Sequence, residues 1–195
     1  MRKSKKTSVK ALLITFVCLV ICAAVAFAVF IGYSKYEFSS HPTMYSDFVD
    51  RYSSQYKLDK YEVYSFILTE SGFNEKSESY LGARGLMQIM PETFEWIRYK
   101  LDEENDPLMT FDKMYEAETN IRYGCYLLSY LHECFGELDE VAAAYHAGQG
   151  SVESWLSDER YSENGRLTDI PNPDTAHYVD KITNAYDTYS RLYKK

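Results

Sequence analysis

The chain has 195 residues and a formal net charge of −8, from 29 acidic and 21 basic side chains. Five basic residues lie within residues 1–10 and the first carboxylate is Glu37, so the chain beyond residue 10 carries 16 basic and 29 acidic side chains and a net charge near −13. Nucleic-acid binding needs a basic surface that neutralises phosphates, so this composition excludes nucleic acid as a partner. The length suits one domain with a substantial core and a short N-terminal segment.

The first predicted element is a membrane-spanning helix. Residues 11–32 form a run of 22 residues with no charged side chain, and about 20 apolar residues let a helix cross a bilayer. The cations of residues 1–10 predict a basic tail that stays in the cytoplasm, which places the rest of the chain outside. We therefore expect a single-pass protein of the cell membrane, in which residues 33–43 link the anchor to an extracytoplasmic domain, residues 44–195.

A cleaved signal peptide is the competing interpretation of the same segment. The triplets Ala24–Ala26 and Ala26–Ala28 both have the A-x-A form of a cleavage site. The apolar core of a signal peptide is about 7–15 residues long, however, and this run continues past both triplets. Cys22 follows Val20 and Ile21 rather than small residues, which disfavours lipid attachment. These features favour an uncleaved anchor.

Residues 44–195 show helical periodicity and no substantial run of alternating apolar residues, which predicts an all-α domain. Pro91 suits the first turn of one helix. Most of the 19 tyrosines are expected to pack the core, and residues 161–173 are expected to be a polar loop. Seven helices are predicted, over Tyr45–Gln55, Leu58–Glu70, Pro91–Leu101, Tyr115–Phe135, Leu138–His146, Val152–Leu156 and Asp174–Tyr193.

Two cysteines, Cys125 and Cys134, lie outside the predicted anchor. On one helix their separation would put them on opposite faces and about 13 Å apart along the axis, beyond the reach of a disulfide. We expect two thiols in the core. Neither a C-x-x-C nor an H-E-x-x-H pattern occurs, so the sequence predicts no metal site and no cofactor.

Glu70 is the candidate for chemistry. It ends an apolar helix, and a polar loop containing glycine separates it from the apolar stretch Gly85–Pro91, GLMQIMP. Burial beside apolar groups raises the pKa of a carboxyl group, which then stays protonated near neutral pH and can act as the general acid in sugar cleavage. A solvated, idle Glu at a helix end is the alternative.

Four short blocks occur in order along the chain. They are Glu70-Ser71, Gly82–Gln88 (GARGLMQ), Ala144–Gly148 (AYHAG) and Asp174–Val179 (DTAHYV). Together they resemble the blocks of the soluble-lytic-transglycosylase (SLT) catalytic domain, a lysozyme-like family that cleaves peptidoglycan. The resemblance covers about residues 44–192, and it implies a lysozyme-like, all-α SLT domain that follows the membrane helix.

The resemblance implies a mechanism that uses one carboxyl group. Glu70 would protonate the oxygen between N-acetylmuramic acid and N-acetylglucosamine. Its carboxylate would then take a proton from the 6-hydroxyl of the muramic sugar, which attacks C1 and closes a 1,6-anhydro ring. One positioned residue can act first as acid and then as base. The implied partners are peptidoglycan glycan strands and the membrane, and the sequence names no protein partner.

The matching blocks also imply residues that bind substrate. Ser79 stands where the family places a hydroxyl against the N-acetyl group, and Gln88 with the Met87 backbone would border the cleft. Tyr145 should lie beside the acid, and Tyr178 should face the cleft. The structural alternatives are a serine that caps the loop, an amide satisfied by the backbone, and tyrosines that only pack the core.

Two blocks depart from the family pattern. The third usually reads A-Y-N-A-G, and here His146 replaces the Asn; imidazole can also donate and accept, so we expect His146 to bind substrate as well. The fourth usually reads E-T-R-x-Y-V, and here it begins with Asp174 and lacks the Arg. That change weakens any case for a second carboxylate in this block.

Two other functions stay open. One is a muramidase of the same fold, which would use water and Glu75, Glu78 or Asp174 as a second carboxylate. The other is a wall-binding module that has kept the fold without turnover. The intact Glu70 and the GLMQ block favour the transglycosylase.

Overall fold

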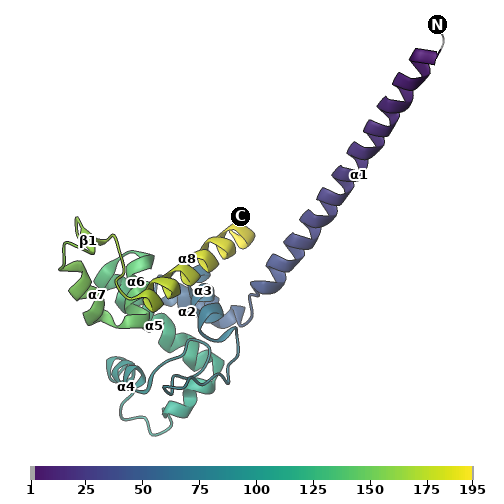
Figure 1. Ribbon diagram of the computed structural model, residues 1–195. Helices are drawn as coiled ribbons and strands as arrows, with labels where there is room; N and C mark the ends of the chain where they lie inside the picture. Colours follow the sequence, from purple (N-terminus) through teal and green to yellow (C-terminus); the bar gives the residue numbers. More distant parts are fainter. Residues whose placement is uncertain (1–2, 195) are drawn as a thin grey trace. The chain divides into compact units, whose positions relative to one another are not determined.

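The computed structural model describes residues 3–194, most of them in α-helices (Figure 1). The chain divides into two compact units, Met1–Pro42 and Thr43–Lys195. The predicted all-α class is confirmed, with one very short hairpin added. The elements are α1 (Lys3–Ser40), α2 (Ser46–Gln55), α3 (Lys60–Ser71), α4 (Pro91–Lys100), the 3-10 helix η1 (Phe111–Tyr115), α5 (Ala117–Phe135), α6 (Leu138–Ala147), α7 (Gln149–Leu156), β1 (Ser162–Glu163), β2 (Arg166–Leu167) and α8 (Pro173–Tyr193).

α1 runs past the predicted end of the anchor. Residues 33–43, expected to be a linker, are helical as far as Ser40, because no glycine or proline interrupts them before Pro42. A proline disfavours helical geometry at the residue before it, which accounts for the end of the helix. The stretch Lys10–Ser40 has the length and composition needed to cross a membrane. Residues 1–2 of the predicted basic tail lie outside the described residues.

α3 carries the candidate acid near its C-terminal end. At its start the Asp59 side chain accepts a hydrogen bond of 2.9 Å from the backbone nitrogen of Tyr61, which satisfies one of the free donors of the first turn. At its end Gly72 adopts a left-handed conformation with φ 56°, which glycine reaches at low cost. Glu70 therefore lies in the last turn, where the helix leaves the core. The apolar side chains buried on α3 are Val63, Tyr64, Phe66 and Ile67.

α8 packs against α3 and α6 (Figure 1). Tyr189 of α8 stacks on Tyr64 of α3, with ring centroids 5.5 Å apart. One face of α8 is apolar and packs against these helices. Its buried members are Tyr178, Ile182, Ala185 and Tyr189. This packing brings the C-terminal helix against the helix that carries Glu70.

The start of α8 differs from the prediction. The helix begins at Pro173, one residue before the predicted start, and Asn172 caps it: Oδ1 of Asn172 accepts from the backbone nitrogens of Asp174 and Thr175 at 3.0 and 3.2 Å. Pro173 occupies the first turn, where its missing N–H costs nothing. Thr175 is fully buried, and its hydroxyl lies within hydrogen-bonding distance of His146.

Two further expectations were wrong around α5. The stretch that ends at Tyr115 is a separate 3-10 helix, and α5 itself begins at Ala117. Cys125 is buried, but Cys134 is exposed. Two residues on opposite faces of a helix cannot both face one core, so the predicted pair of core thiols is reduced to one.

Candidate active site

Glu70 lies in a largely apolar setting at the end of α3. Burial raises its pKa to about 7, although a hydrogen bond from Tyr178 works in the opposite direction. A carboxyl group with this pKa is about half protonated near neutral pH, so it can both give and take a proton there. The side chain keeps some exposure to solvent, which leaves it accessible to a substrate.

Two tyrosines from later helices lie beside Glu70. The Tyr178 hydroxyl on α8 donates a hydrogen bond of 2.5 Å to Oε1 of Glu70. Tyr145 on α6 packs against Phe66, with ring centroids 4.9 Å apart. Burial, and then the nearby Glu70 charge, raise the pKa of both phenols. Both tyrosines therefore remain neutral donors, and only Glu70 changes its charge near neutral pH.

Asn120 of α5 holds the loop between α3 and α4. Its Oδ1 accepts from the Met87 backbone nitrogen at 2.7 Å, and its Nδ2 donates to the carbonyl oxygens of Arg84 and Met114, both at 2.8 Å. The side chain is fully buried. We did not single out Asn120 from the sequence. Its only signal there is an amide on the apolar face of a helix, which must find partners when it is buried.

Gly85 makes this arrangement possible. It adopts φ 78°, and a Cβ atom at this position would lie 2.0 Å from the Met114 carbonyl oxygen and 2.2 Å from Nδ2 of Asn120. Gly124 on α5 plays a similar part, since a Cβ there would lie 2.1 Å from Sδ of Met87. The GLMQ segment thus sits directly on α5, and a Cβ atom at either glycine would force the neighbouring atoms to move.

The same loop is also fixed to α3 and α6. Ser71 Oγ donates to the Leu86 carbonyl oxygen at 2.8 Å. The Tyr145 hydroxyl donates to the Met87 carbonyl oxygen at 2.6 Å. Three helices therefore hold the loop next to Glu70, and a site held in this way needs little reorganisation to act.

Three predicted substrate-binding residues have structural partners within this loop. Gln88 adopts φ 47°. Its Nε2 donates to the carbonyl oxygen of Gly85 at 2.9 Å and to that of Ser77 at 3.2 Å. Ser79 Oγ accepts from the Ala83 backbone nitrogen at 3.0 Å. The Met87 side chain is fully buried. Contacts of Ser79, Met87 and Gln88 with substrate remain predictions.

His146 lies at the end of α6 and is exposed. Its Nδ1 is 3.0 Å from Oγ1 of Thr175, and its ring lies 4.7 Å from that of Tyr178 between centroids. Packing away from water lowers the pKa of His146, and the charge of Asp174 opposes this shift. The imidazole is therefore neutral near neutral pH. It contacts the ring of Tyr178, whose hydroxyl donates to Glu70.

The three candidate second carboxylates have other partners or face solvent. Glu78 accepts from the Tyr115 hydroxyl at 2.7 Å and pairs with Arg84 at 3.3 Å; these two bonds lower its pKa. Glu75 lies 3.6 Å from Nζ of Lys76, and Asp174 is exposed. Within the described part of the chain, none of the three hydrogen-bonds to Glu70.

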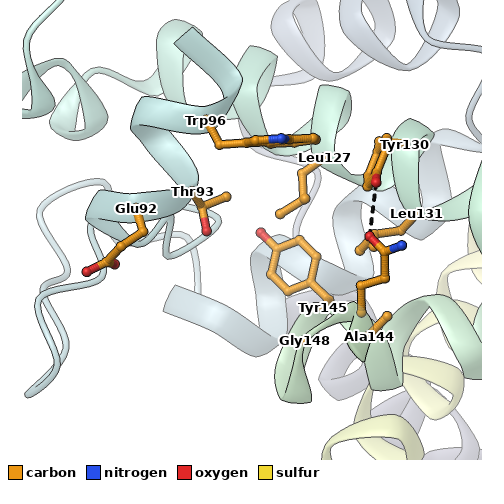
Figure 2. Close-up of a pocket in the computed structure, with 10 residues that line it drawn as sticks. Glu92, Thr93, Trp96, Leu127, Tyr130, Leu131, Ala144, Tyr145 and Gly148 are labelled. Atoms are coloured by element: carbon orange, nitrogen blue, oxygen red, sulfur yellow. Dashed lines mark hydrogen bonds between the residues drawn. The ribbon is translucent and has the colours of Figure 1, made fainter. Parts of the chain in front are cut away.

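A cavity of about 340 Å³ opens beside Tyr145 (Figure 2). Figure 2 shows the Tyr145 ring among side chains contributed by α4, α5 and α7. The Tyr130 hydroxyl donates to Oε1 of Gln149 at 2.9 Å, and its ring meets the edge of Trp96 at 4.8 Å. Aromatic faces beside amide and hydroxyl groups suit an amphipathic ligand such as a sugar. Apart from Tyr145, sequence reasoning missed this lining, because two separate helices bring the aromatic residues together.

Residues 47–167, more than half of the chain, match the family described as "Transglycosylase SLT domain". The chain belongs to this SLT family. The resemblance that the four blocks indicate is thereby confirmed. The fourth block, which begins at Asp174, lies beyond the matched residues.

Relatives and solved structures of the SLT family agree with this assignment. The soluble lytic murein transglycosylase of Escherichia coli (strain K12) is 32% identical over 157 residues, which are 78% of this chain and 24% of that protein. Membrane-bound lytic murein transglycosylase C of Edwardsiella ictaluri is 26% identical over 174 residues, 76% of this chain and 47% of that one. The structure of an inactive mutant of lytic transglycosylase Slt from Pseudomonas aeruginosa matches with a TM-score of 0.68 and 28% identity, over 77% of this chain and 24% of the other.

These comparisons confirm the SLT fold, but they cover only part of each relative. The chain spans about a quarter of the length of the Escherichia coli and Pseudomonas aeruginosa proteins. Activity and substrate of the whole protein therefore need support from the site itself.

Proposed function

We propose that this protein is a membrane-anchored peptidoglycan lytic transglycosylase. It would cleave the β-1,4 bond between N-acetylmuramic acid and N-acetylglucosamine without water and leave 1,6-anhydro ends. The observation that carries this proposal is Glu70, whose pKa of about 7 and bond from Tyr178 suit proton transfer in both directions. The SLT relatives, which are named as murein transglycosylases, supply the substrate class.

Glu70 acts twice in the proposed reaction. In its protonated form it donates its proton to the bridging oxygen, which leaves with the bonding electrons on N-acetylglucosamine. The resulting carboxylate then accepts the proton of the muramic 6-hydroxyl as that oxygen bonds to C1. The Tyr178 hydroxyl stabilises the carboxylate between the two transfers, since it donates to Oε1. Atoms balance without water, and Glu70 ends as it began.

The remaining site residues would position the glycan. Tyr145 links the acid to the cavity beside α4, α5 and α7, whose size and lining suit one sugar unit of the strand. Ser79, Gln88 and the Met87 backbone would contact the N-acetyl and hydroxyl groups nearer Glu70. His146, exposed at the same end of α6, is the remaining candidate contact.

A muramidase of the same fold is the principal alternative. It would need a second carboxylate to activate water or trap the sugar, and the bonds of Glu78 make it a poor candidate. Mass spectrometry of products from purified peptidoglycan separates the two reactions. We expect anhydromuramic ends, lighter than hydrolysed ends by one water. Products with reducing ends alone would assign the protein to the muramidases.

The pH dependence of turnover should report Glu70. Only its protonated form can begin the reaction, so kcat/KM should fall as pH rises through about 7, by about tenfold per further pH unit. Initial rates on soluble glycan strands across this pH range would measure the fall in kcat/KM. A fall centred at the ordinary pKa of a carboxyl group would contradict the role of burial.

A binding module without turnover is the other class to exclude. Zymography of the purified protein in a gel that contains peptidoglycan decides this directly. A cleared band supports an enzyme, and binding without clearing would sink the proposal.

We also propose that α1 anchors the protein in the cell membrane, with its N-terminus in the cytoplasm. An uncharged run of 22 residues follows five cations, and one relative is named as membrane-bound. Such a topology leaves the catalytic domain outside the membrane, where peptidoglycan lies.

Protease accessibility tests this topology. Protease is added to cells in which the outer face of the cell membrane is accessible. It should degrade the catalytic domain and leave a small fragment that contains α1, because the bilayer protects that segment. Detection with tags at either end would identify the fragment. Release of an intact domain that starts near residue 27–29 in untreated cells would show signal cleavage instead.

A further inference from the structure

His146 rests against the tyrosine that bonds Glu70. The ring centroids of His146 and Tyr178 are 4.7 Å apart, and Nδ1 of His146 lies 3.0 Å from the Thr175 hydroxyl. Thr175 and Tyr178 are three positions apart on α8, so they share one face of that helix. The imidazole therefore contacts two neighbouring residues of α8 at once, which fixes its orientation over the Tyr178 ring.

Tyr178 depends on packing to aim its hydroxyl. The ring lies 6.5 Å from that of Phe66, edge to face, and the hydroxyl reaches Oε1 of Glu70 at 2.5 Å. Phe66 belongs to the core, whereas His146 is the exposed contact of the ring. A tyrosine side chain turns about two bonds, so removing one packed neighbour widens the range of directions that its hydroxyl can take.

We propose that His146 is a positioning residue for the reaction, which acts by holding Tyr178 in hydrogen-bonding geometry with Glu70. The effect of His146 on catalysis rests on the proposed function. Its effect on the Tyr178–Glu70 hydrogen bond does not depend on whether the protein is an enzyme. It differs from a role of His146 in contacting substrate, because its effect passes entirely through the Tyr178 hydroxyl.

The proposal predicts the direction in which the Glu70 pKa changes when Tyr178 or His146 is replaced. The hydrogen bond from Tyr178 favours the ionised form of Glu70 and so lowers its pKa. Tyr178→Phe should therefore raise the pKa of Glu70. His146→Ala should move it in the same direction by a smaller amount, because the hydroxyl would still be present but less often aligned. Direct hydration of the site through the missing imidazole would move the pKa the other way.

A double-mutant cycle on the full chain tests the proposal. The variants are His146→Ala, Tyr178→Phe and the double substitution, and the readout is the Glu70 pKa from carboxyl 13C NMR. The double variant should match Tyr178→Phe, since without the hydroxyl there is nothing left to align. His177→Asn is the matched control. His177 is exposed on α8 next to Tyr178 in sequence, and its replacement should leave the Glu70 pKa unchanged.

Kinetics of the same variants give the catalytic counterpart. His146→Ala should lower kcat roughly five- to tenfold, with little change in KM, and should cost nothing further once Tyr178 is Phe. An unchanged or lowered Glu70 pKa in His146→Ala, or losses that multiply in the double variant, would overturn the proposal and assign His146 to substrate contact. His146 is exposed at a helix end and Ala favours helices, so the variant should fold. The NMR measurement does not require turnover, so a failure of the proposed function would be distinguished from a failure of this inference.

Discussion

Glu70→Gln should reduce turnover by roughly 100-fold or more, the usual scale of a lost general acid–base residue. Gln keeps the size of the side chain and can still accept from the Tyr178 hydroxyl, but it can neither give nor take the catalytic proton. Binding of glycan strands should survive, because the proposed contacts to sugar come from other residues. Single-turnover rates and binding isotherms on the same soluble glycan separate the two effects.

Stability measurements show whether the loss is chemical. Burial raises the pKa of Glu70 to about 7, above its value in the unfolded chain, so its contribution to stability is fully present at low pH and is lost as pH rises through about 7. Gln has no proton to lose. The melting temperature of Glu70→Gln should therefore equal or exceed that of the wild type above pH about 7, with a smaller difference in mild acid. Glu133→Gln, on the exposed side of α5, controls for the loss of one surface charge. Undiminished cleavage by Glu70→Gln would remove Glu70 from the mechanism.

Gly85→Ala should have the largest effect on folding. The new Cβ would lie 2.0 Å from the Met114 carbonyl oxygen and 2.2 Å from Nδ2 of Asn120, so the loop must move away from α5 and give up bonds of Asn120. Overpacking and a left-handed alanine together should cost about 3 kcal/mol or more in the free energy of unfolding. Chemical denaturation would measure this, and activity should fall with it because the GLMQ segment moves.

Gly82→Ala is the matched control for this substitution. Gly82 lies in the same loop with φ 85°, and a Cβ there meets no atom within 4 Å. It should cost only the backbone term, about 1 kcal/mol. The difference between the two variants isolates the contact with Asn120. Equal destabilisation by both substitutions would mean that backbone strain, rather than this contact, accounts for the requirement for glycine.

The amino-acid sequence by itself determined the features that depend on near neighbours. Helical periodicity and local signals such as Pro91 set most helix positions to within a few residues. The four blocks indicated the family and selected Glu70 among many carboxylates. The uncharged run of residues 11–32 is likewise a local property. An error arose where one helix offered two faces, as at Cys134, and α1 continues as a helix beyond the predicted anchor.

Only the tertiary structure decided how distant residues combine. The bond from Tyr178 to Glu70 joins positions 108 apart in the chain, and the bonds of Asn120 to the loop span up to 36. A stripe of tyrosines at helical spacing predicts burial, but it does not say which hydroxyl meets a carboxylate, because that depends on how α8 packs across α3 and α6. The pKa of Glu70 is decided at the same level, since it depends on how much water the packed helices exclude.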